Sequence, residues 1–317
     1  MLSDDSKFFQ QDQPLNQTEV LRSLIVPHPL FTQTLHRFLN CLQSNRPAFL
    51  VGIPGCGLST LVKQSERLHI KSLTIEAPFA LPREENWHNF YLRSLSILEG
   101  AEGYRSRKRQ RLLELETEFT QKLLEQQKQC VIVDNAQHLF CGSFSPNKLY
   151  GNLSYFSSLL DSNVTYHLVG NYGLLEQIFK SERLTRQMEV IQFPTYSGRQ
   201  GFQKFRSILK QFQPYLVINE EPEMQDVDFF YEFSLGCIGI LQPWLLRAFL
   251  LASNNNDSLV RRTYFEETAP LTVRIRHLLD TDLRQEKQFR ELLGDNHSSD
   301  DEPPDLTTKK KPWKGPR

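Results

Sequence analysis

Residues 52–60 have the sequence GIPGCGLST, and this stretch decides the fold expected for the chain. An apolar run, Ala48-Phe49-Leu50-Val51, precedes it, and residues 58–69 have helical character. A glycine-rich turn between a buried strand and a helix is the context of the phosphate-binding loop with the pattern GxxxxGK[ST]. Glycines let backbone N–H groups close around phosphate oxygens, and the helix N-terminus adds a favourable dipole. The placement predicts a P-loop, and the alternative is a glycine-rich turn without a ligand.

One position of this loop departs from the pattern. Leu58 stands where the pattern has a lysine, whose ammonium group neutralises charge on the β- and γ-phosphates. Ser59 keeps the hydroxyl that holds Mg²⁺. We expect Cys56 to be a small filler and not a nucleophile, because no histidine partner is near it in the sequence. The candidate nucleotide-binding residues of the loop are Gly52, Pro54, Gly55, Cys56, Gly57, Leu58, Ser59 and Thr60.

A second motif is the apolar run 131–133 followed by Asp134 and Asn135. An apolar strand that ends in Asp-Glu is the Walker B pattern, in which the aspartate orients Mg²⁺. Asn135 takes the place of the catalytic glutamate, and an amide cannot accept a proton from the attacking water. An aspartate that caps a buried strand is the alternative. Together, Leu58 and Asn135 predict that ATP hydrolysis is impaired.

Further polar residues follow the strands. Asn171 comes directly after the predicted strand 167–170, where an amide can contact the γ-phosphate or its water; a turn asparagine is the alternative. For Gln137 and His138, loop packing behind the Walker B strand is favoured over a metal or acid–base role. His28 and His36 are interpreted as helix-face residues.

The order of elements predicts the fold class. Predicted strands alternate with predicted helices up to Pro194, which favours an α/β fold with a doubly wound parallel sheet. Only helices are predicted afterwards. The strands are expected at 48–51, 72–77, 130–134, 167–170 and 190–193. Helices are expected between them at 87–99, 108–128 and 147–161, and the later helices at about 198–212, 225–235, 240–253 and 272–292.

Four segments are expected. Residues 1–24 form a polar arm, 25–195 a nucleotide-binding α/β domain, 196–293 a small all-helical lid domain, and 294–317 a tail too polar and proline-rich to pack. Trp313 in that tail favours a docking peptide over a purely solubilising segment.

Composition excludes several classes of protein. The 37 Lys and Arg residues balance 37 Asp and Glu residues. The net charge therefore neither favours nor excludes a nucleic-acid partner. No two of the five cysteines form a CxxC pair, which disfavours a zinc site or a disulfide framework. The apolar runs are far shorter than the ~20 residues of a membrane-spanning helix. The N-terminus is acidic and polar, unlike a signal peptide. We therefore expect a cytoplasmic protein without a membrane partner.

Several segments, taken in order, resemble a known family. The segments GIPGCGLST, VIVDNAQHL, LVGNYGLL, RLTRQMEVIQFPTY and GCIGILQPWLLRA are similar to the TnsC/TniB family of AAA+ transposition regulators. The resemblance covers roughly residues 26–255. In that family, ATP-bound subunits assemble as a ring or filament around duplex DNA and link a target-selecting protein to the transposase. The resemblance implies ATP and Mg²⁺ as cofactors, and duplex DNA, a TniQ-like target selector, a transposase and further copies of the chain as partners.

The same resemblance implies roles for individual residues. Gly52, Gly55, Gly57, Ser59 and Thr60 correspond to the phosphate loop, Asp134 to the Mg²⁺ aspartate and Asn171 to sensor 1. Arg186 corresponds to an arginine that acts across a subunit interface, with Arg183 as substitute. Arg247 is a weaker candidate for the sensor arginine of the helical domain.

A basic cluster occupies the region before the Walker B strand. Its members are Arg105, Arg107, Lys108, Arg109 and Arg111. The family resemblance places DNA-tracking residues here, and phosphate contacts need no sequence code. A solvated charged face at the start of a helix is the alternative.

Three functions remain open from the sequence. The first is a DNA-bound AAA+ transposition regulator with impaired hydrolysis. The second is an active ATPase switch of the same family, in which another cation replaces the missing lysine. The third is a pseudo-ATPase adaptor with an empty nucleotide site.

Overall fold

The computed structural model describes residues 28–78, 86–99, 109–140, 146–196, 198–212, 227–257, 260–270 and 272–292. The predicted arm 1–24, the tail 294–317 and three members of the basic cluster (Arg105, Arg107 and Lys108) lie outside these residues. The described chain divides into two compact units, one of residues Pro29–Pro194 and the other of His28 together with the residues from Thr195 onward.

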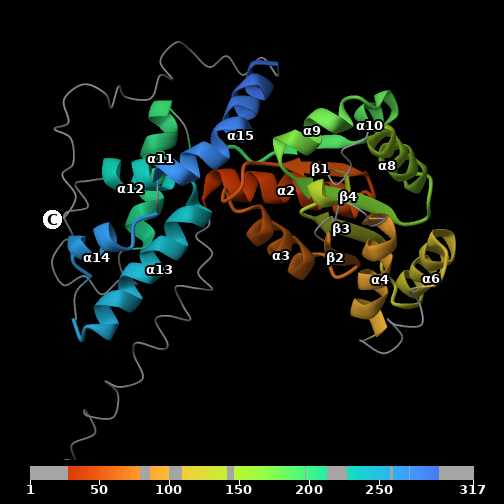
Figure 1. Cartoon of the computed structure of the whole chain (residues 1–317), viewed down its shortest axis with the longest axis horizontal. Helices are drawn as coiled ribbons and strands as arrows, with labels where there is room; N and C mark the ends of the chain where they lie inside the picture. Colours follow the sequence, from red (N-terminus) through yellow and green to blue (C-terminus); the bar gives the residue numbers. More distant parts are fainter. Residues whose placement is uncertain are drawn as a thin grey trace, which may run out of the picture. The chain divides into compact units, whose positions relative to one another are not determined.

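The first unit is built on a five-stranded parallel sheet (Figure 1). The strand order is β2-β3-β4-β1-β5. The strands are β1 (Ala48–Val51), β2 (Ser72–Glu76), β3 (Cys130–Asp134), β4 (Thr165–Gly170) and β5 (Glu189–Gln192). The predicted parallel α/β sheet is thus confirmed, with β4 starting two residues earlier than predicted because Thr165 pairs with Cys130 of β3.

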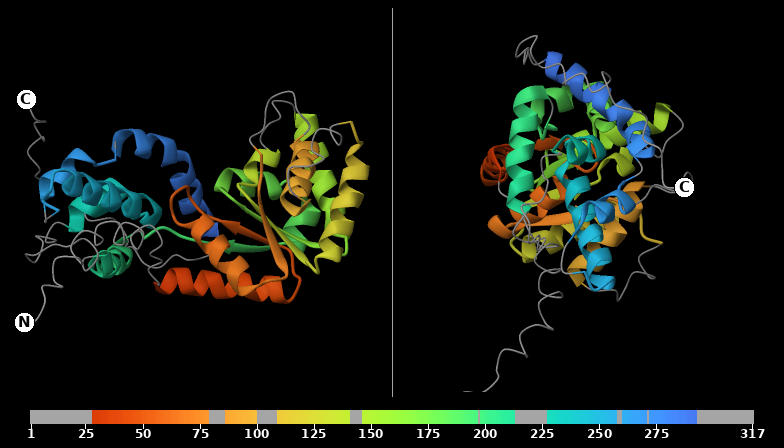
Figure 2. Two further views of the ribbon diagram at one scale, coloured as in Figure 1. Left: turned by 90° about the horizontal axis from the view of Figure 1, so that it is seen from below. Right: turned by 90° about the vertical axis from the view of Figure 1, so that its left-hand side faces the viewer.

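Helices cover both faces of this sheet (Figure 2). The connection from β1 to β2 crosses the sheet in the opposite direction to the three later connections, and right-handed crossovers therefore put it on the opposite face. One face carries α2 (Pro29–Gln43) and α3 (Leu58–Leu68). The later connections contain α4 (Asn86–Glu99), α6 (Leu112–Glu125), α7 (Gln137–Phe140), α8 (Pro146–Leu159), α9 (Tyr172–Ile178) and α10 (Glu182–Gln187).

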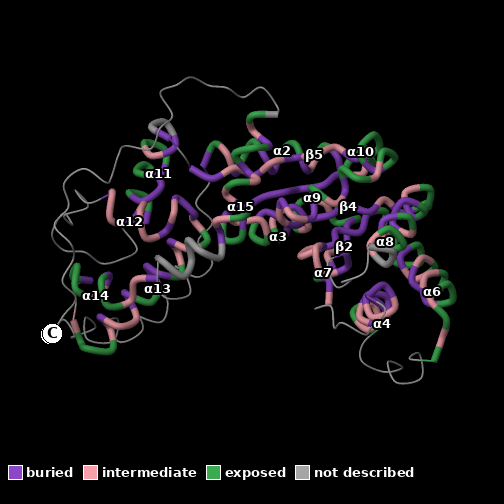
Figure 3. Tube along the Cα trace, turned by 45° about the horizontal axis from the view of Figure 1, so that its top comes forward, coloured by how far each residue is buried: buried purple, intermediate pink, exposed green. Residues whose placement is uncertain are grey.

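The core lies along the sheet, where the central strands are buried on both sides (Figure 3). All four residues of β1 are fully buried, as expected of a parallel strand covered by helices on both faces. Under α4, the Trp87 ring packs against Phe90, Phe140 and Phe156 at centroid distances of 5.6, 5.9 and 6.1 Å. This packing joins α4 to α7 and α8.

Three local predictions were wrong. His28 was interpreted as a helix-face residue, but α2 begins at Pro29 and His28 is buried beside the Tyr196 hydroxyl. His36 does lie on an exposed face of α2. The helix expected from residue 108 begins at Leu112, because the extended Arg111 donates its backbone N–H to the Glu114 carboxylate at 2.9 Å and ends the preceding turn. Gln137 and His138, expected in a loop, start the short helix α7.

The second unit is helical, as predicted for the C-terminal portion. Its helices are α11 (Gly198–Phe212), α12 (Val227–Ser234), α13 (Ile238–Asn254), α14 (Arg262–Glu267) and α15 (Thr272–Leu292). Trp244 of α13 is fully buried and donates its indole N–H to the Phe265 carbonyl at 2.9 Å. Across the described ranges, no single helix is long and apolar enough to cross a membrane; only the bent pair α12 and α13, taken together, meets that criterion.

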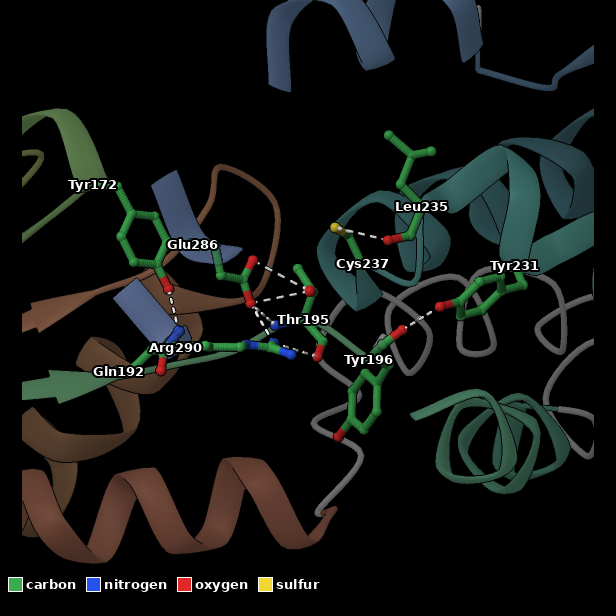
Figure 4. Close-up of polar contacts among 9 residues, drawn as sticks. All are labelled: Tyr172, Gln192, Thr195, Tyr196, Tyr231, Leu235, Cys237, Glu286 and Arg290. Carbon is green, nitrogen blue, oxygen red and sulfur yellow. Dashed lines mark hydrogen bonds and ion pairs between the residues drawn. The ribbon is translucent and has the colours of Figure 1, made fainter. Parts of the chain in front are cut away.

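A buried polar network holds the start of this unit (Figure 4). The Glu286 carboxylate of α15, 3% exposed, accepts hydrogen bonds from the Thr195 backbone N–H at 2.9 Å and from the Thr195 hydroxyl. Arg290 forms an ion pair with Glu286 and donates to the Thr195 carbonyl at 3.2 Å. The Tyr231 hydroxyl binds the next carbonyl, that of Tyr196. Every charged group of the network therefore has an opposite charge or a hydrogen-bond partner.

Candidate nucleotide site

The sequence motifs meet at one edge of the sheet. The chain leaves β1 for α3 on one face and leaves β4 for α9 on the other, so the carboxyl ends of these neighbouring strands form a topological switch point. Ligands of open α/β sheets bind at such points. The loop 52–57 follows β1, Asp134 ends β3 and Asn171 follows β4. The three predicted motifs are thus brought to the same edge.

The loop after β1 has the conformation that only glycines allow. Gly55 and Gly57 have φ angles of 87° and 115°, in the region that side chains disfavour. A Cβ at Gly52 would lie 2.7 Å from the Cys56 sulfur and 2.9 Å from the Phe193 carbonyl oxygen. Gly57 offers no side-chain cap to α3. Pro54, Gly55, Ser59 and Thr60 are exposed. A close-packed glycine loop that leads into an uncapped helix N-terminus fits phosphate groups.

Position 58 supplies no positive charge to this loop. The Leu58 side chain lies against the loop, with Cδ1 3.5 Å from where a Cβ of Gly52 would stand. Lys63 follows Ser59 by one helical turn on α3 and is exposed. Its charge acts on Asp134, where it favours the ionised form. A cation is therefore present near the Walker B strand, although not at the lysine position of the pattern.

Asp134 is the candidate metal ligand of the site. Burial raises the pKa of the Asp134 carboxyl, while hydrogen bonds from the Ser59 hydroxyl and the Asn135 backbone N–H, the latter at 2.9 Å, partly offset that rise. Glu76, paired with Asp134 in the β2–β3 register, raises it further by its negative charge. A half-buried carboxylate beside a serine hydroxyl supplies oxygen donors that suit Mg²⁺.

Asn135 has a left-handed backbone, with φ 54°. Asparagine tolerates this region better than most residues with a side chain. Its side-chain amide donates to Glu76 Oε1 at 3.3 Å, and Arg93 of α4 lies 3.3 Å from the other Glu76 oxygen. Glu76 belongs to no sequence motif, and only the strand register places it beside Asp134.

Asn171 is the N-cap of α9. Its side-chain oxygen accepts the Leu174 backbone N–H at 3.2 Å, which leaves its amide N–H groups as the donors for other groups. Nearby, Gln137 Oε1 is buried without a hydrogen-bond partner, and a Cβ at Gly170 would lie 2.9 Å from it. His138 is half-buried, and burial lowers the pKa of its imidazole.

The predicted arginines lie elsewhere. Arg183 makes two hydrogen bonds of 2.5 and 2.6 Å to the Asp161 carboxylate. The Arg186 side chain is 73% exposed and pairs only weakly, at 3.4 Å, with Glu182 on its own helix. Both precede β5, which runs parallel to β1, and therefore lie at the amino edge of the sheet, opposite the P-loop.

The remaining candidates lie outside the switch point. Arg247 is exposed on α13 of the helical unit. In the basic cluster, Arg109 and Arg111 are exposed just before α6.

Comparisons with known proteins agree with this geometry. A family model described as an AAA domain matches residues 42–178, the span that contains the P-loop, Asp134 and Asn171. The fold is the P-loop fold of AAA+ proteins. None of the curated proteins compared with the chain matches it in sequence.

Solved structures share this AAA+ fold at low sequence identity. The ORC1 protein of Aeropyrum pernix in complex with DNA has a TM-score of 0.59 at 15% identity, covering 79% of this chain and 68% of that chain. A Walker-type ATPase of Pyrococcus abyssi has a TM-score of 0.53 at 15% identity, covering 82% and 76%. Drosophila ORC bound to DNA has a TM-score of 0.50 at 14% identity, covering 93% and 81%.

Proposed function

We propose that this chain is an AAA+ regulator of DNA transposition that oligomerises on duplex DNA and bridges a target-selection protein to a transposase. It holds ATP and Mg²⁺ but hydrolyses ATP slowly. One observation carries the nucleotide part of the proposal. The glycine loop, Asp134 and Asn171 lie at one edge of the sheet, which supports a phosphate site, while Leu58 and Asn135 replace two groups that hydrolysis uses. The transposition part rests on the sequence resemblance of residues 26–255.

Each group of the site has a distinct task in this proposal. The backbone N–H groups of the loop and of the α3 N-terminus bind phosphate oxygens. Ser59 and Asp134 hold Mg²⁺, which neutralises charge on the phosphates when bound. The Asn171 amide donates to the γ-phosphate or to the water beside it. With Leu58 in place of lysine, less charge is neutralised when the transition state forms. ATP is therefore bound but hydrolysed slowly.

Arg186 is the candidate for action across a subunit interface. It lies at the amino edge of the sheet, separated from its own P-loop by the length of β1, about 13 Å. Its exposed guanidinium can therefore meet the nucleotide of an adjacent copy, whereas Arg183 is held by Asp161. The ring or filament of the proposal places Arg186 next to the neighbouring copy's phosphate loop.

The basic cluster before α6 is the proposed DNA-binding element. The two described members, Arg109 and Arg111, are exposed, and contacts of arginine with DNA phosphates need no base sequence. Two proteins with the same fold, the Aeropyrum pernix ORC1 protein and Drosophila ORC, are described in complex with DNA.

Arg186→Ala tests the assembly. With duplex DNA and a nonhydrolysable ATP analogue, the wild-type chain is expected to form rings or filaments visible by electron microscopy. Arg186→Ala is expected to abolish them while leaving thermal stability unchanged, because its exposed pair with Glu182 contributes little. Arg183→Ala is the matched control and should still assemble. Full assembly of Arg186→Ala would contradict the proposed interface.

A second candidate function is an active ATPase switch. Lys63 favours it, because its charge reaches Asp134 and so lies near the metal position. Turnover typical of intact AAA+ enzymes, lost in Lys63→Ala, would select this alternative. Purified protein that never binds nucleotide would select the pseudo-ATPase adaptor.

A further inference from the structure

Two neighbouring strands each end in a carboxylate. Glu76 ends β2, and its register partner Asp134 ends β3. The Asn135 amide, one residue later, donates to Glu76 Oε1 at 3.3 Å. A carboxylate therefore stands beside the position where the Walker B pattern has its glutamate.

We propose that Glu76 supplies the proton-accepting carboxylate for the slow ATP hydrolysis of this chain, in place of the glutamate absent from position 135. This rests on the nucleotide site of the proposed function. Glu76 lies on the strand next to the one that position 135 follows, about 4.8 Å away along the hydrogen-bonding direction of the sheet.

The backbone explains why the carboxylate is not at position 135. Asn135 has φ 54°, and the Ala136 N–H that follows is fixed by the Val169 carbonyl at 2.9 Å. This left-handed conformation is tolerated by asparagine and disfavoured for glutamate. A glutamate at 135 would also face Glu76 directly. Asparagine instead binds the Glu76 carboxylate and orients it.

The surroundings of Glu76 leave it able to act. Its side chain is 56% exposed, and its contacts with Asn135 and Arg93 are both long, at 3.3 Å. The negative charge of Glu76 acts on Asp134 of β3 and on His138 of α7. The contacts with Asn135 and Arg93 therefore leave the Glu76 carboxylate accessible to water.

Glu76 acts as the base in the hydrolysis step. Glu76 takes one proton from the attacking water while a bond forms between the water oxygen and the γ-phosphorus. The bond from that phosphorus to the β–γ bridging oxygen breaks, and its electron pair leaves on ADP. Glu76 then returns the proton to solvent or to phosphate.

The test compares Glu76→Gln with Glu125→Gln. Glutamine keeps the shape of Glu76 and an oxygen for the Asn135 amide, but cannot accept the proton. Glu125 is a matched control, because it is an exposed carboxylate on α6 that pairs with Lys122. Binding of a nonhydrolysable ATP analogue with Mg²⁺ is measured by calorimetry. Single-turnover hydrolysis is measured with protein in excess, in the wild-type chain and in a Leu58→Lys background that raises the rate.

The proposal expects Glu76→Gln to lower the hydrolysis rate about 100-fold in both backgrounds, the scale of a lost general base. Affinity for the analogue should stay within about 2-fold, the scale expected when a group acts in the transition state and not in binding. Glu125→Gln should change neither. Unchanged hydrolysis in Glu76→Gln, with analogue binding intact, overturns this proposal alone. Absence of analogue binding in the wild-type chain, or of hydrolysis in both backgrounds, also overturns it, and the former overturns the nucleotide part of the proposed function as well.

Discussion

Two carboxylates, one in each unit, have contrasting surroundings. Glu286 in the helical unit is 3% exposed and has a complete set of partners: the Thr195 N–H, the Thr195 hydroxyl and Arg290. Asp134 in the α/β unit has the Ser59 hydroxyl and one backbone N–H, and burial raises the pKa of its carboxyl. A buried charge with all its partners can be removed only at a cost, because its partners are left unpaired, whereas a buried charge with too few partners destabilises the fold and leaves oxygen atoms for a ligand. The contrast supports a structural role for Glu286 and the metal-binding role proposed for Asp134.

Removal of the structural carboxylate should have the largest effect. Glu286→Ala leaves Arg290 and the Thr195 N–H without their acceptor, and breaking such a buried pair costs about 3 kcal/mol or more. Urea denaturation should show this loss in the helical unit, where Trp244 is a buried reporter. A loss below about 0.5 kcal/mol, as for an ordinary surface substitution, would remove the contrast between the two carboxylates.

Restoration of the missing groups should raise hydrolysis. Leu58→Lys with Asn135→Glu is expected to increase turnover about 100-fold, equal to about 2.7 kcal/mol in the barrier, because both charge neutralisation and a base at position 135 return. Most of the gain should come from Leu58→Lys, since Asn135 has a left-handed backbone and faces Glu76. Steady-state phosphate release measures the effect. No gain in the double variant would show that the site is impaired beyond these two residues.

The cationic side chains of the two units also differ in their surroundings. Arg290 is tied to Glu286, whereas Arg109 is exposed and its cluster carries several like charges. Replacing Arg105, Arg107 and Arg109 with Ala should weaken binding to duplex DNA about 10-fold on unrelated sequences and flatten the salt dependence. Fluorescence anisotropy at several salt concentrations measures both. Equal affinity and slope in the triple variant would remove the cluster from the DNA interface.

The Asp134 carboxylate should destabilise the nucleotide-free protein, and this effect should be the smallest of those predicted here. The folded-state pKa of Asp134 lies above its ordinary value of 3.8, so the folded state holds the proton more tightly than the unfolded state. The resulting penalty is absent below pH 3.8 and grows as pH rises through the folded-state pKa. Asp134→Asn should therefore stabilise the nucleotide-free protein at pH 7 by roughly 1 kcal/mol or less, with the gain vanishing in acid. Thermal unfolding at several pH values tests this, and a loss of stability at pH 7 would contradict it.

Much of the α/β fold follows from local sequence. The run 48–51 followed by GIPGCGLST predicted a buried strand, a glycine loop and a helix, and alternating elements predicted the parallel sheet. The short helices α7, α9, α10 and α14 were missed, because four to seven residues are too few to show a helical period.

The missed side chains depend on distant partners. Glu76 gains its place from the register of β2 with β3, 58 positions along the chain from Asp134, and an isolated strand pattern does not contain that register. Thr195 and Glu286 meet across a separation of 91 residues. The roles of Asn171, Arg183, Arg186 and Arg247 stay predictions, since the structure gives their positions and not their activity.

The central claim is that the chain assembles on DNA with ATP held and barely hydrolysed. The most direct measurement is the nucleotide content of DNA-bound assemblies, separated by sedimentation after incubation of the full chain with duplex DNA, ATP and Mg²⁺. The account predicts assemblies that contain close to one nucleotide per chain, mostly still ATP after a time in which an intact AAA+ enzyme would have converted it all. Assemblies that contain only ADP, or protein that sediments with DNA without nucleotide, would contradict it.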